Sequence, residues 1–324
     1  MVAVSSVVVK SLSIVIVNWN TADMTCACIA SIFSVKAELD CEIIVVDNAS
    51  SDESVARIKS TFPDIILIEN ASNLGFGAAN NLGFAKATGD YVLALNSDTL
   101  VIGNVLQNSI AYLDRHPEVG AMGCRVLNPD RTIQFTCSGY PSILNLLLQV
   151  TGLSKLPWPL FLDRYRMHRW NRTDEREVEV ISGCYLMVPK SIISEVGGFD
   201  EDFFFFGEET DWCRRIRKTG KKLMFAPVGE IIHYGGGSVK RLDFRRDLML
   251  SSAIVKLHQK NGGLISAIVT MGIVCGFNFS RALYYSILSL VSKQSSTLER
   301  RRHFIDLTVN SLKIWPRGRT YNFE

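Results

Sequence analysis

The 324-residue chain lacks the features that mark several large classes of protein. Its net charge is only +3, and it has no RNP motif, no zinc-finger spacing and no long basic arm, so we expect no nucleic-acid partner. Its eight cysteines include no CxxC pair, and most lie in apolar runs such as "ISGCYLM", which predicts reduced core thiols in a cytosolic-facing protein. The apolar N-terminus has neither the charged region nor the cleavage-site pattern of a signal peptide, and its β-branched residues predict a strand.

Apolar residues are abundant, at 47% of the chain with 10% aromatic residues, which is enough to bury a full core. We expect one large domain with an appendage, or two small domains. In the first half, short runs of valine and isoleucine alternate with segments of helical spacing. This alternation predicts an α/β fold with a mostly parallel central sheet and helices on both faces. The expected strands are residues 12–19, 41–48, 65–70 and 91–96, and the expected helices are 23–36, 52–60 and 77–88.

Polar residues gather where each expected strand ends. In parallel sheets the ligand crevice lies outside the carboxyl ends of the strands, so these residues are candidates for a binding site. Some members have a simpler explanation: Asp52 suits a helix cap, and Asn73 with Gly75 suits a turn. Because all four strand ends are polar, we favour a binding crevice over capping alone. The residues at the strand ends are Asn18, Trp19, Asn20, Asp47, Asn48, Ser50, Asp52, Asn73, Gly75, Asn80, Asn96, Ser97 and Asp98.

Residues 203–212 read "FFFFGEETDW", which places four phenylalanines directly before Glu208, Glu209 and Asp211. Apolar bulk is usually buried, whereas clustered carboxylates are usually solvated. The segment "EETDWCRRIRKTG" has a helical pattern that ends at Gly220, and acidic side chains stabilise a helix N-terminus. A structural role at the start of a helix is therefore one explanation for all three carboxylates.

Five segments of the chain, taken together and in this order, resemble one known family: "SIVIVNWN", "IIVVDNASSDES", "NLGFGAANNLG", "LALNSD" and "GGFDEDFFFFGEETDWCRRIRKTG". The family is glycosyltransferase family 2, and the resemblance is strongest to its rhamnosyltransferase branch, which has the GT-A fold. It extends over roughly residues 12–240. The resemblance implies a GT-A domain over residues 1–240, with a nucleotide-binding half at about 10–115 and an acceptor half at about 116–240. Residues 241–324 are then a helical C-terminal region that associates with a membrane or forms a dimer.

The resemblance implies a nucleotide-sugar donor, which presents a base, a ribose and a diphosphate. Trp19 would stack on the base, with core packing as its alternative, and Asp47 would accept hydrogen bonds from the base or the ribose. Asn73 and Asn80 would line the same pocket, unless Asn80 faces into its own helix. The remaining donor contacts are assigned to Asn18, Asn48, Ser50, Asp52, Gly75, Asn96 and Ser97.

The DXD motif of the family corresponds to Asn96-Ser97-Asp98, in which an asparagine replaces the first carboxylate. A diphosphate requires a divalent cation, and hard oxygen ligands suit Mg²⁺ or Mn²⁺. Because only one acidic ligand remains, a second ligand is assigned to His233 in "IIHYGGGS", which resembles a metal-binding histidine of related enzymes. A histidine in an apolar strand is also a common structural residue, and this alternative stays open.

In the family, an acidic residue at the start of this helix removes the proton from the acceptor hydroxyl. The resemblance assigns that role to Glu209 and leaves Asp211 as the alternative, while the phenylalanines form the pocket wall. Low-polarity surroundings raise the pKa of a carboxylate and make it a better base. The implied reaction is an inverting displacement at the anomeric carbon. Lys240 and Arg241 are either further contacts to the phosphate or solvated surface charge.

Two other segments bear on the acceptor and on location. Residues 155–172 interleave basic and aromatic side chains, which suits an interfacial or diphosphate-binding element, or a plain surface helix. Residues 264–290 are apolar but contain Asn278 and Arg281, so the uninterrupted part is short for a membrane span. The tail that follows suits an anionic membrane surface, with dimerisation through the same surface as the alternative. Its basic residues are Lys293, Arg300, Arg301, Arg302, Lys313, Arg317 and Arg319.

These expectations combine into one predicted function, the transfer of a single sugar in cell-envelope glycan synthesis. The chain has no Q-x-x-R-W motif, which relatives that polymerise sugars carry, so we expect one sugar to be added. The expected donor is dTDP-rhamnose and the expected acceptor is lipid-linked or a polysaccharide. The alternatives are a UDP-sugar-dependent hexosyl or galactofuranosyl transferase, and a non-catalytic protein that binds sugar nucleotides. The expected location is cytoplasmic, peripheral on the inner face of the cell membrane.

Overall fold

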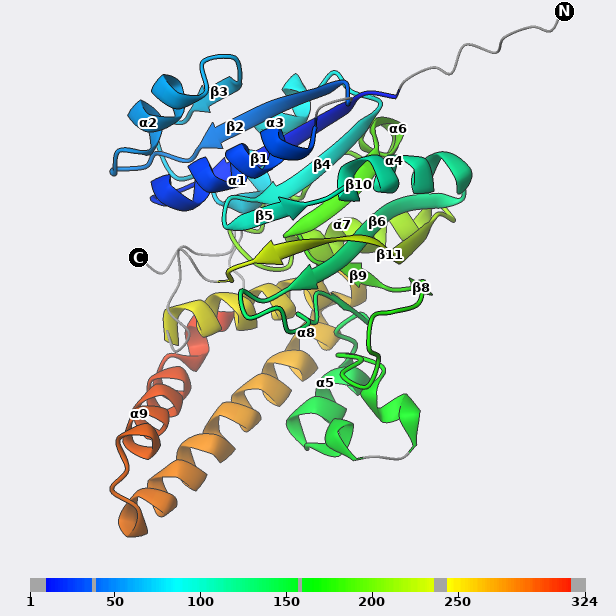
Figure 1. Cartoon of the computed structure of the whole chain (residues 1–324). Helices are drawn as coiled ribbons and strands as arrows, with labels where there is room; N and C mark the ends of the chain where they lie inside the picture. The colour runs from blue at the N-terminus through cyan, green and yellow to red at the C-terminus, as the bar shows by residue number, and fades with distance from the viewer. Residues whose placement is uncertain (1–9, 37–38, 157–158, 236–243, 316–324) are drawn as a thin grey trace, which may run out of the picture.

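The computed structural model describes residues 10–36, 39–156, 159–235 and 244–315, and Figure 1 shows how its elements are arranged. The seven elements expected in the first half are all present, within two residues of the expected bounds. The apolar run before residue 10 and the side chains of Lys240, Arg241, Arg317 and Arg319 lie outside the described residues. The first elements are β1 (Leu12–Asn18), α1 (Ala22–Val35), β2 (Cys41–Asp47), α2 (Ser54–Thr61), β3 (Ile66–Glu69), α3 (Phe76–Lys86), β4 (Tyr91–Asn96), β5 (Thr99–Ile102) and α4 (Val105–Arg115).

The second half of the chain completes the sheet and adds a helical region. The helix that begins at Glu208 ends just before Gly220, which has φ of +87°, so the expected glycine stop is confirmed. The remaining elements are β6 (Val119–Leu127), β7 (Cys137–Ser138), α5 (Ile143–Val150), η1 (Leu153–Lys155), η2 (Leu160–Asp163), β8 (Arg176–Glu177), β9 (Val180–Ile181), β10 (Tyr185–Pro189), α6 (Lys190–Val196), α7 (Glu208–Lys218), β11 (Lys222–His233), α8 (Phe244–Val291), α9 (Ser295–Val309) and η3 (Ser311–Ile314).

The main sheet of the described residues has the strand order β3-β2-β1-β4-β10-β6-β11-β5, with β8 paired to β11. The strands β1, β2, β3 and β4 are all parallel, and β10 then runs antiparallel between β4 and β6. The predicted α/β fold with a mostly parallel sheet is therefore confirmed in the first half, and the second half is mixed. In the register of the parallel strands, Asn18 lies beside Asp47 and Val17 beside Asn96. The polar strand ends thus meet at one edge of the sheet.

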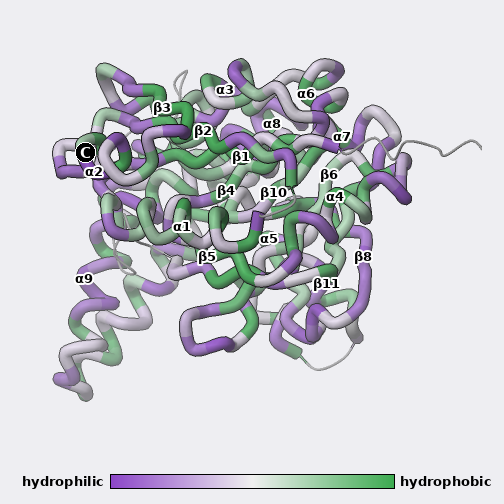
Figure 2. Tube along the Cα trace, turned by 45° about the horizontal axis from the view of Figure 1, so that its top comes forward, coloured by the Kyte–Doolittle hydropathy of each residue, from purple (hydrophilic) through white to green (hydrophobic). Residues whose placement is uncertain are grey.

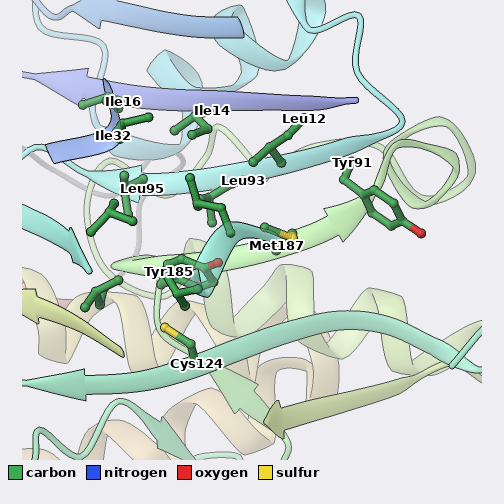
Figure 3. Packing of buried hydrophobic residues seen from close by; sticks show 14 of the residues in the cluster. Leu12, Ile14, Ile16, Ile32, Tyr91, Leu93, Leu95, Cys124, Tyr185 and Met187 are labelled. Carbon is green, nitrogen blue, oxygen red and sulfur yellow. The ribbon is translucent and has the colours of Figure 1, made fainter. Parts of the chain in front are cut away.

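Helices cover both faces of this sheet because the central strands are apolar on both sides. Alternate residues of β1 show the division: Ile14 and Ile16 pack with α1, α2 and α4, whereas Val15 packs with α3, α6 and α7. Figure 3 shows side chains of the first of these two layers, among them Leu93 on β4 and Met187 on β10. Removing each such side chain from water contributes roughly 1.5–3 kcal/mol to folding.

The C-terminal region is a bent helix followed by a returning helix, which confirms the predicted helical appendage. Within α8, Gly263 has φ of +72° and ψ of −172°, so the helix breaks there into two parts. The part before Gly263 packs onto the main domain, where Ala253 and Leu257 contact Phe203. The part after it forms a hairpin with α9 that protrudes from the domain (Figure 1). We therefore propose that the division between the two parts of the protein lies at Gly263 rather than near residue 240.

Candidate active site

The ends of β1 and β2 are joined by a buried hydrogen-bond network centred on Asn18. The side chain of Asn18 donates to Asp47 Oδ1 at 2.7 Å and to Ser50 Oγ at 3.0 Å. Its oxygen accepts from Thr25 Oγ1 at 2.6 Å and from Thr21 Oγ1 at 2.9 Å. Because every polar group of Asn18 is engaged and the residue is fully buried, it holds the two strand ends together rather than facing a ligand.

Asp47 is fixed by the same network. Its Oδ2 accepts from the Ser50 backbone N–H at 2.9 Å, which closes a tight loop after β2. Beside it, Trp19 follows β1 and is half-buried, so part of its ring is accessible to solvent. The two residues expected to contact the base and ribose therefore lie at the ends of neighbouring strands, in register at the sheet edge.

Two residues other than glycine at these strand ends have left-handed backbone conformations, namely Asn20 (φ +54°) and Ala49 (φ +63°). Strained backbone of this kind is costly and tends to occur at functional sites. The side chain of Asn20 accepts from the Ser51 N–H at 2.7 Å and so ties the first loop to the second. Asp52 accepts from Ala22 N at 3.2 Å and from Ser54 N at 3.1 Å, which places it as a cap at the start of both α1 and α2.

The side chains of the asparagines after β2 and β3 also form hydrogen bonds within the protein. Asn48 donates to Asn73 Oδ1 at 2.8 Å and accepts from the Leu74 N–H at 2.9 Å. Asn73 in turn accepts from the Gly75 N–H at 2.9 Å. The Nδ2 of Asn80 donates to the Phe76 carbonyl of its own helix at 2.9 Å, while no group of the described residues hydrogen-bonds to its buried Oδ1. These residues shape the loops around the crevice.

A second cluster lies at the end of β4, where Asn96, Asp98 and His233 meet. His233 ends β11, which pairs with β5 so that His233 lies opposite Thr99. Its Nε2 is 3.2 Å from Asp98 Oδ1 and 3.2 Å from Asn96 Nδ2. Asp98 is buried. The structure thus brings together the residues that the sequence assigned to the metal.

Gln134, which the sequence did not single out, sets the proton position on His233. The Gln134 Nε2 donates to the His233 carbonyl at 2.5 Å, which turns its Oε1 toward His233 Nδ1 at 2.8 Å. In the neutral ring Nδ1 then carries the hydrogen, and the Nε2 lone pair accepts from Asn96 Nδ2 at 3.2 Å. A ligand histidine is commonly oriented by such a partner.

The donor set fits a divalent cation. His233 Nε2 also lies 3.2 Å from Asp98 Oδ1, so these two atoms are spaced to share one cation. This spacing is close to the ~3 Å between neighbouring ligands of an octahedral ion with bonds of about 2.1 Å. No group of three or more His, Cys, Asp or Glu side chains with suitable spacing occurs among the described residues. The protein therefore offers two ligands, and an anionic donor has to supply others.

The acidic cluster begins α7, directly after the phenylalanines. Glu208 is buried, and burial together with the neighbouring Glu209 raises the pKa of Glu208 well above its usual range. Burial also raises the pKa of Glu209, although N–H groups of Gly207 and of Glu209 itself oppose the shift. Among the described residues no group hydrogen-bonds to the buried Oε2 of Glu209. Glu209 thus has the raised pKa and the free oxygen that a general base requires.

Asp211 lies in the same turn of α7 but has a different environment. It is completely buried, and its Oδ2 accepts from Arg215 Nε at 2.7 Å. Its Oδ1 lies 2.8 Å from Lys260 Nζ on α8. Both carboxylate oxygens of Asp211 are therefore engaged by cations, whereas Glu209 has no such partner in the described structure.

The phenylalanine run connects three parts of the molecule. Phe203 is fully buried against α8, and the Phe204 carbonyl accepts from the Phe76 N–H at 3.0 Å at the start of α3. A side chain at Gly75, which has φ of +82°, would overlap that carbonyl, so the close approach requires glycine. The run therefore fixes the start of α7 between the start of α3 and the C-terminal helix α8.

Cys184 lies near both the cluster of Asn96, Asp98 and His233 and the acidic start of α7. Burial raises the pKa of the Cys184 thiol to about 12, and the negative charges of Asp98 and Glu209 both add to the shift. The backbone carbonyl of Cys184 also accepts from the Asn96 N–H at 3.3 Å. Asp98 and Glu209 therefore lie within electrostatic range of one thiol, although 111 residues separate them in the sequence.

The sheet, its covering helices and the polar strand ends define a GT-A glycosyltransferase fold. The structure superposes on mannosyltransferase PcManGT from Pyrobaculum calidifontis, solved with GDP-Man and Mn²⁺, with a TM-score of 0.56 and 17% identity over 94% of this chain and 87% of that chain. It also superposes on GalNAc-T7, solved with UDP, GalNAc and Mn²⁺, with a TM-score of 0.55 and 15% identity over 96% of this chain and 58% of that chain. At these identities the likeness shows the fold alone.

The chain belongs to glycosyl transferase family 2, whose model matches residues 13–196. It is 26% identical to an N-acetylglucosaminyl-diphospho-decaprenol L-rhamnosyltransferase from Mycobacterium tuberculosis over 219 residues, which are 64% of this chain and 71% of that protein. It is 24% identical to rhamnosyltransferase WbbL from Escherichia coli over 169 residues, which are 49% of this chain and 61% of that protein. The predicted family, fold and enzyme class are therefore confirmed: the protein is a rhamnosyltransferase-like glycosyltransferase.

Proposed function

We propose that this enzyme transfers one L-rhamnose, with inversion, from dTDP-rhamnose to a lipid-linked or polysaccharide acceptor in cell-envelope glycan synthesis. The observation that carries the proposal is the match of the family model to residues 13–196, which contain the Asn96-Ser97-Asp98 motif, and His233 lies 3.2 Å from Asp98. The choice of rhamnose is supported by the two rhamnosyltransferases to which the chain is similar.

The donor would bind across the ends of β1, β2 and β4. We assign stacking on the base to Trp19, and hydrogen bonds to the base or ribose to Asp47, which is held in place by Asn18 and Ser50. The other polar residues at the strand ends act by shaping the loops, because their side chains are engaged within the protein. These positioning residues are Asn48, Ser50, Asp52, Asn73, Gly75 and Asn80, and Ser97 lies 3.2 Å from Thr21 in the same network.

Asp98 and His233 would hold Mg²⁺ or Mn²⁺, with Asn96 beside them. The cation, when bound, neutralises charge on the departing diphosphate. Gln134 would support the single carboxylate by holding His233 through Nδ1, which leaves Nε2 on the side of Asp98 and Asn96. The oxygen and imidazole donors suit either of these ions.

Glu209 would take the proton from the acceptor hydroxyl. As the proton passes to the Glu209 carboxylate, the hydroxyl oxygen forms a bond to the anomeric carbon from the face opposite the nucleoside diphosphate. The bond between that carbon and the diphosphate oxygen breaks, and the diphosphate leaves with its electron pair. We assign Asp211 to positioning of α7, because Arg215 and Lys260 occupy both of its oxygens.

A product assay tests the proposal. The full-length protein is incubated with Mn²⁺, a lipid extract that contains polyprenyl-diphosphate-linked sugars, and dTDP-rhamnose or a UDP-hexose. The proposal predicts release of dTDP and a gain of one deoxyhexose in the lipid, with inverted anomeric configuration by NMR. Product from a UDP-sugar alone would establish the alternative donor class. Donor binding without release of nucleoside diphosphate for any acceptor would establish a non-catalytic binding protein.

A further inference from the structure

The hairpin formed by the second part of α8 and by α9 has one packed side. Between the two helices, Met271 and Cys275 pack with Phe304 and Leu307, and the rings of Tyr285 and Phe304 stack at 5.7 Å between centroids. The helix α8 is long and apolar enough to span a membrane by length and composition, and few of those apolar side chains are buried. The packing with α9 accounts for only one side of this apolar helix.

The opposite side of the same helix is an uncovered apolar stripe. Ile265, Leu290 and Val291 are 79%, 82% and 83% exposed. A helix that is apolar on all sides is normally buried, so this stripe requires a further partner. At 3.6 residues per turn its members fall on one face of the helix, in two groups before and after residue 270. The stripe comprises Ile265, Ile268, Val269, Phe279, Leu283, Ile287 and Leu290, flanked by Leu264, Tyr284 and Val291.

The charge of the hairpin indicates that this partner is negatively charged. Residues 264–315 contain six lysines and arginines but only two acidic residues. Arg300, Arg301 and Arg302 are all exposed on α9. A second copy of this chain would place two such basic surfaces against each other, which is unfavourable. An apolar stripe beside a basic helix instead suits an anionic lipid surface.

A second apolar patch lies on α5, η1 and η2. Leu147 and Phe161 are 41% and 57% exposed, and the other exposed members are Leu144, Leu153 and Leu156. Basic side chains surround this patch, and Asp163, the one acidic residue between 143 and 172, is buried. The exposed basic residues are Lys155, Arg164, Arg166 and Arg169.

The elements that carry the two apolar patches are joined, because α5 packs against α8. His258 connects them: its Nε2 lies 2.8 Å from the Pro141 carbonyl, just before α5, and its Nδ1 lies 2.9 Å from Ser266 Oγ, just after the break at Gly263. Both patches project from the same end of the domain, away from β3 and α2 (Figure 1). Figure 2 shows hydrophobic and hydrophilic stretches mixed along the protruding hairpin, as expected for a surface that contacts both lipid and water.

We propose that the α8–α9 hairpin and the α5–η2 segment form one surface that docks this enzyme onto an anionic bilayer without crossing it. The proposal rests on the proposed function in one respect: a lipid-linked acceptor would be presented to the enzyme at this surface. The hairpin would lie in the interface because α9 occupies one side of the apolar helix and carries three consecutive exposed arginines, 300–302. Apolar side chains enter the acyl boundary while the arginines stay among the head groups.

Vesicle flotation tests the proposal on the full chain. Wild-type protein is mixed with phosphatidylcholine vesicles with or without phosphatidylglycerol, at low and high salt. The variants are Ile268→Ser/Ile287→Ser on the hairpin, Leu144→Ser/Leu147→Ser on α5, and Arg301→Glu/Arg302→Glu on α9. The matched controls are Leu82→Ser/Ile66→Ser, which changes exposed apolar residues on α3 and β3, and Lys86→Glu/Lys218→Glu, which makes the same change of charge elsewhere.

We expect wild-type protein and both controls to float with anionic vesicles at low salt and to be partly released at high salt. Each of the three test variants should bind at least about tenfold more weakly. Donor affinity, measured by thermal shift, should remain as in wild type, so a failure of docking is distinguished from a failure of the proposed activity. Wild-type protein that ignores anionic vesicles and is a dimer by light scattering, which Ile268→Ser/Ile287→Ser converts to a monomer, would assign the stripe to a second copy. Binding unchanged in all three test variants would also overturn the proposal.

Discussion

Lys260 Nζ on α8 lies 2.8 Å from Asp211 Oδ1 on α7 and 2.6 Å from Asp200 Oδ2 in the preceding loop. Although burial lowers the pKa of Lys260, hydrogen bonds to the two carboxylates raise it above its ordinary value, so the amine stays charged. The C-terminal helix therefore supports the start of α7, where Glu209 is placed. The sequence left Glu209 and Asp211 as alternatives for the catalytic base, and the contact with Lys260 distinguishes them because it involves Asp211 alone.

The first prediction concerns Glu209. Glu209→Gln should leave donor binding within about twofold but lower kcat about 10²-fold or more, which is the usual loss when a general base is removed. Single-turnover kinetics with saturating donor and acceptor measures the chemical step. Asp211→Asn should retain more activity than Glu209→Gln. If Asp211→Asn is inactive while it folds and binds donor normally, the two roles are reversed.

The second prediction concerns stability at the contact between α7 and α8. Lys260→Met should lower the free energy of unfolding by about 1–2 kcal/mol, because it leaves the buried Asp211 with only Arg215 as a cation partner. The matched control is Lys59→Met, which breaks an exposed ion pair with Glu69 and should cost less than about 1 kcal/mol. Urea unfolding followed by circular dichroism measures both. Equal losses would show that the Lys260 contact has no special role.

The third prediction concerns the metal pair. Asp98→Ala and His233→Ala should each weaken binding of Mn²⁺ and donor, and activity should vanish with excess chelator and return with Mg²⁺ or Mn²⁺. Gln134→Leu should weaken metal affinity about 10- to 100-fold, as removal of a group that orients a ligand usually does. Gln107→Leu is the control, because Gln107 donates to the Val35 carbonyl elsewhere. Isothermal titration with Mn²⁺ and nucleotide separates these effects, and full activity in chelator would disprove the assignment.

The fourth prediction concerns the pH dependence of stability at Glu208. Its pKa is raised in the folded protein by burial and by Glu209, so the folded state retains a proton that the unfolded state releases. The contribution of Glu208 is therefore fully present below the unfolded pKa of about 4.3 and is lost as pH rises. Glu208→Gln should raise Tm relative to wild type at pH 8, with a difference that shrinks toward pH 5. Glu195→Gln, at an exposed position on α6, should show no such trend.

Most of the fold could be predicted from local patterns. The valine and isoleucine runs of β1 (Leu12–Asn18), β2 (Cys41–Asp47) and β4 (Tyr91–Asn96) are buried on both faces, and only strands between two helical layers require that pattern. The break in α8 had a local signal that the sequence analysis did not use. Residues 261–263 read Asn-Gly-Gly, and Asn-Gly and Gly-Gly pairs commonly mark turns.

Parts of the candidate site could be predicted because chain order places polar residues at strand ends. Asp98, His233 and Glu209 were expected to act together, and the structure brings them around the same region. Gln134 could not be identified, since it has no motif and reaches His233 only through the pairing of distant segments. Asn80 was assigned to the pocket or to its own helix; its Nδ2 bonds to the Phe76 carbonyl of that helix, and its assignment to the pocket stays a prediction.

The sequence alone determined which chemistry the chain carries: a parallel sheet whose strand ends are polar, one acid of a metal motif, and carboxylates beside an aromatic run. Tertiary structure decided which of the carboxylates is paired with a cation and which is not. Asp211 and Glu209 are two residues apart on one helix, yet Lys260, 49 residues further along the chain, neutralises the first and leaves the second without a cation. The protonation and reactivity of a buried carboxylate depend on the charges packed around it, and that packing is a property of the folded chain.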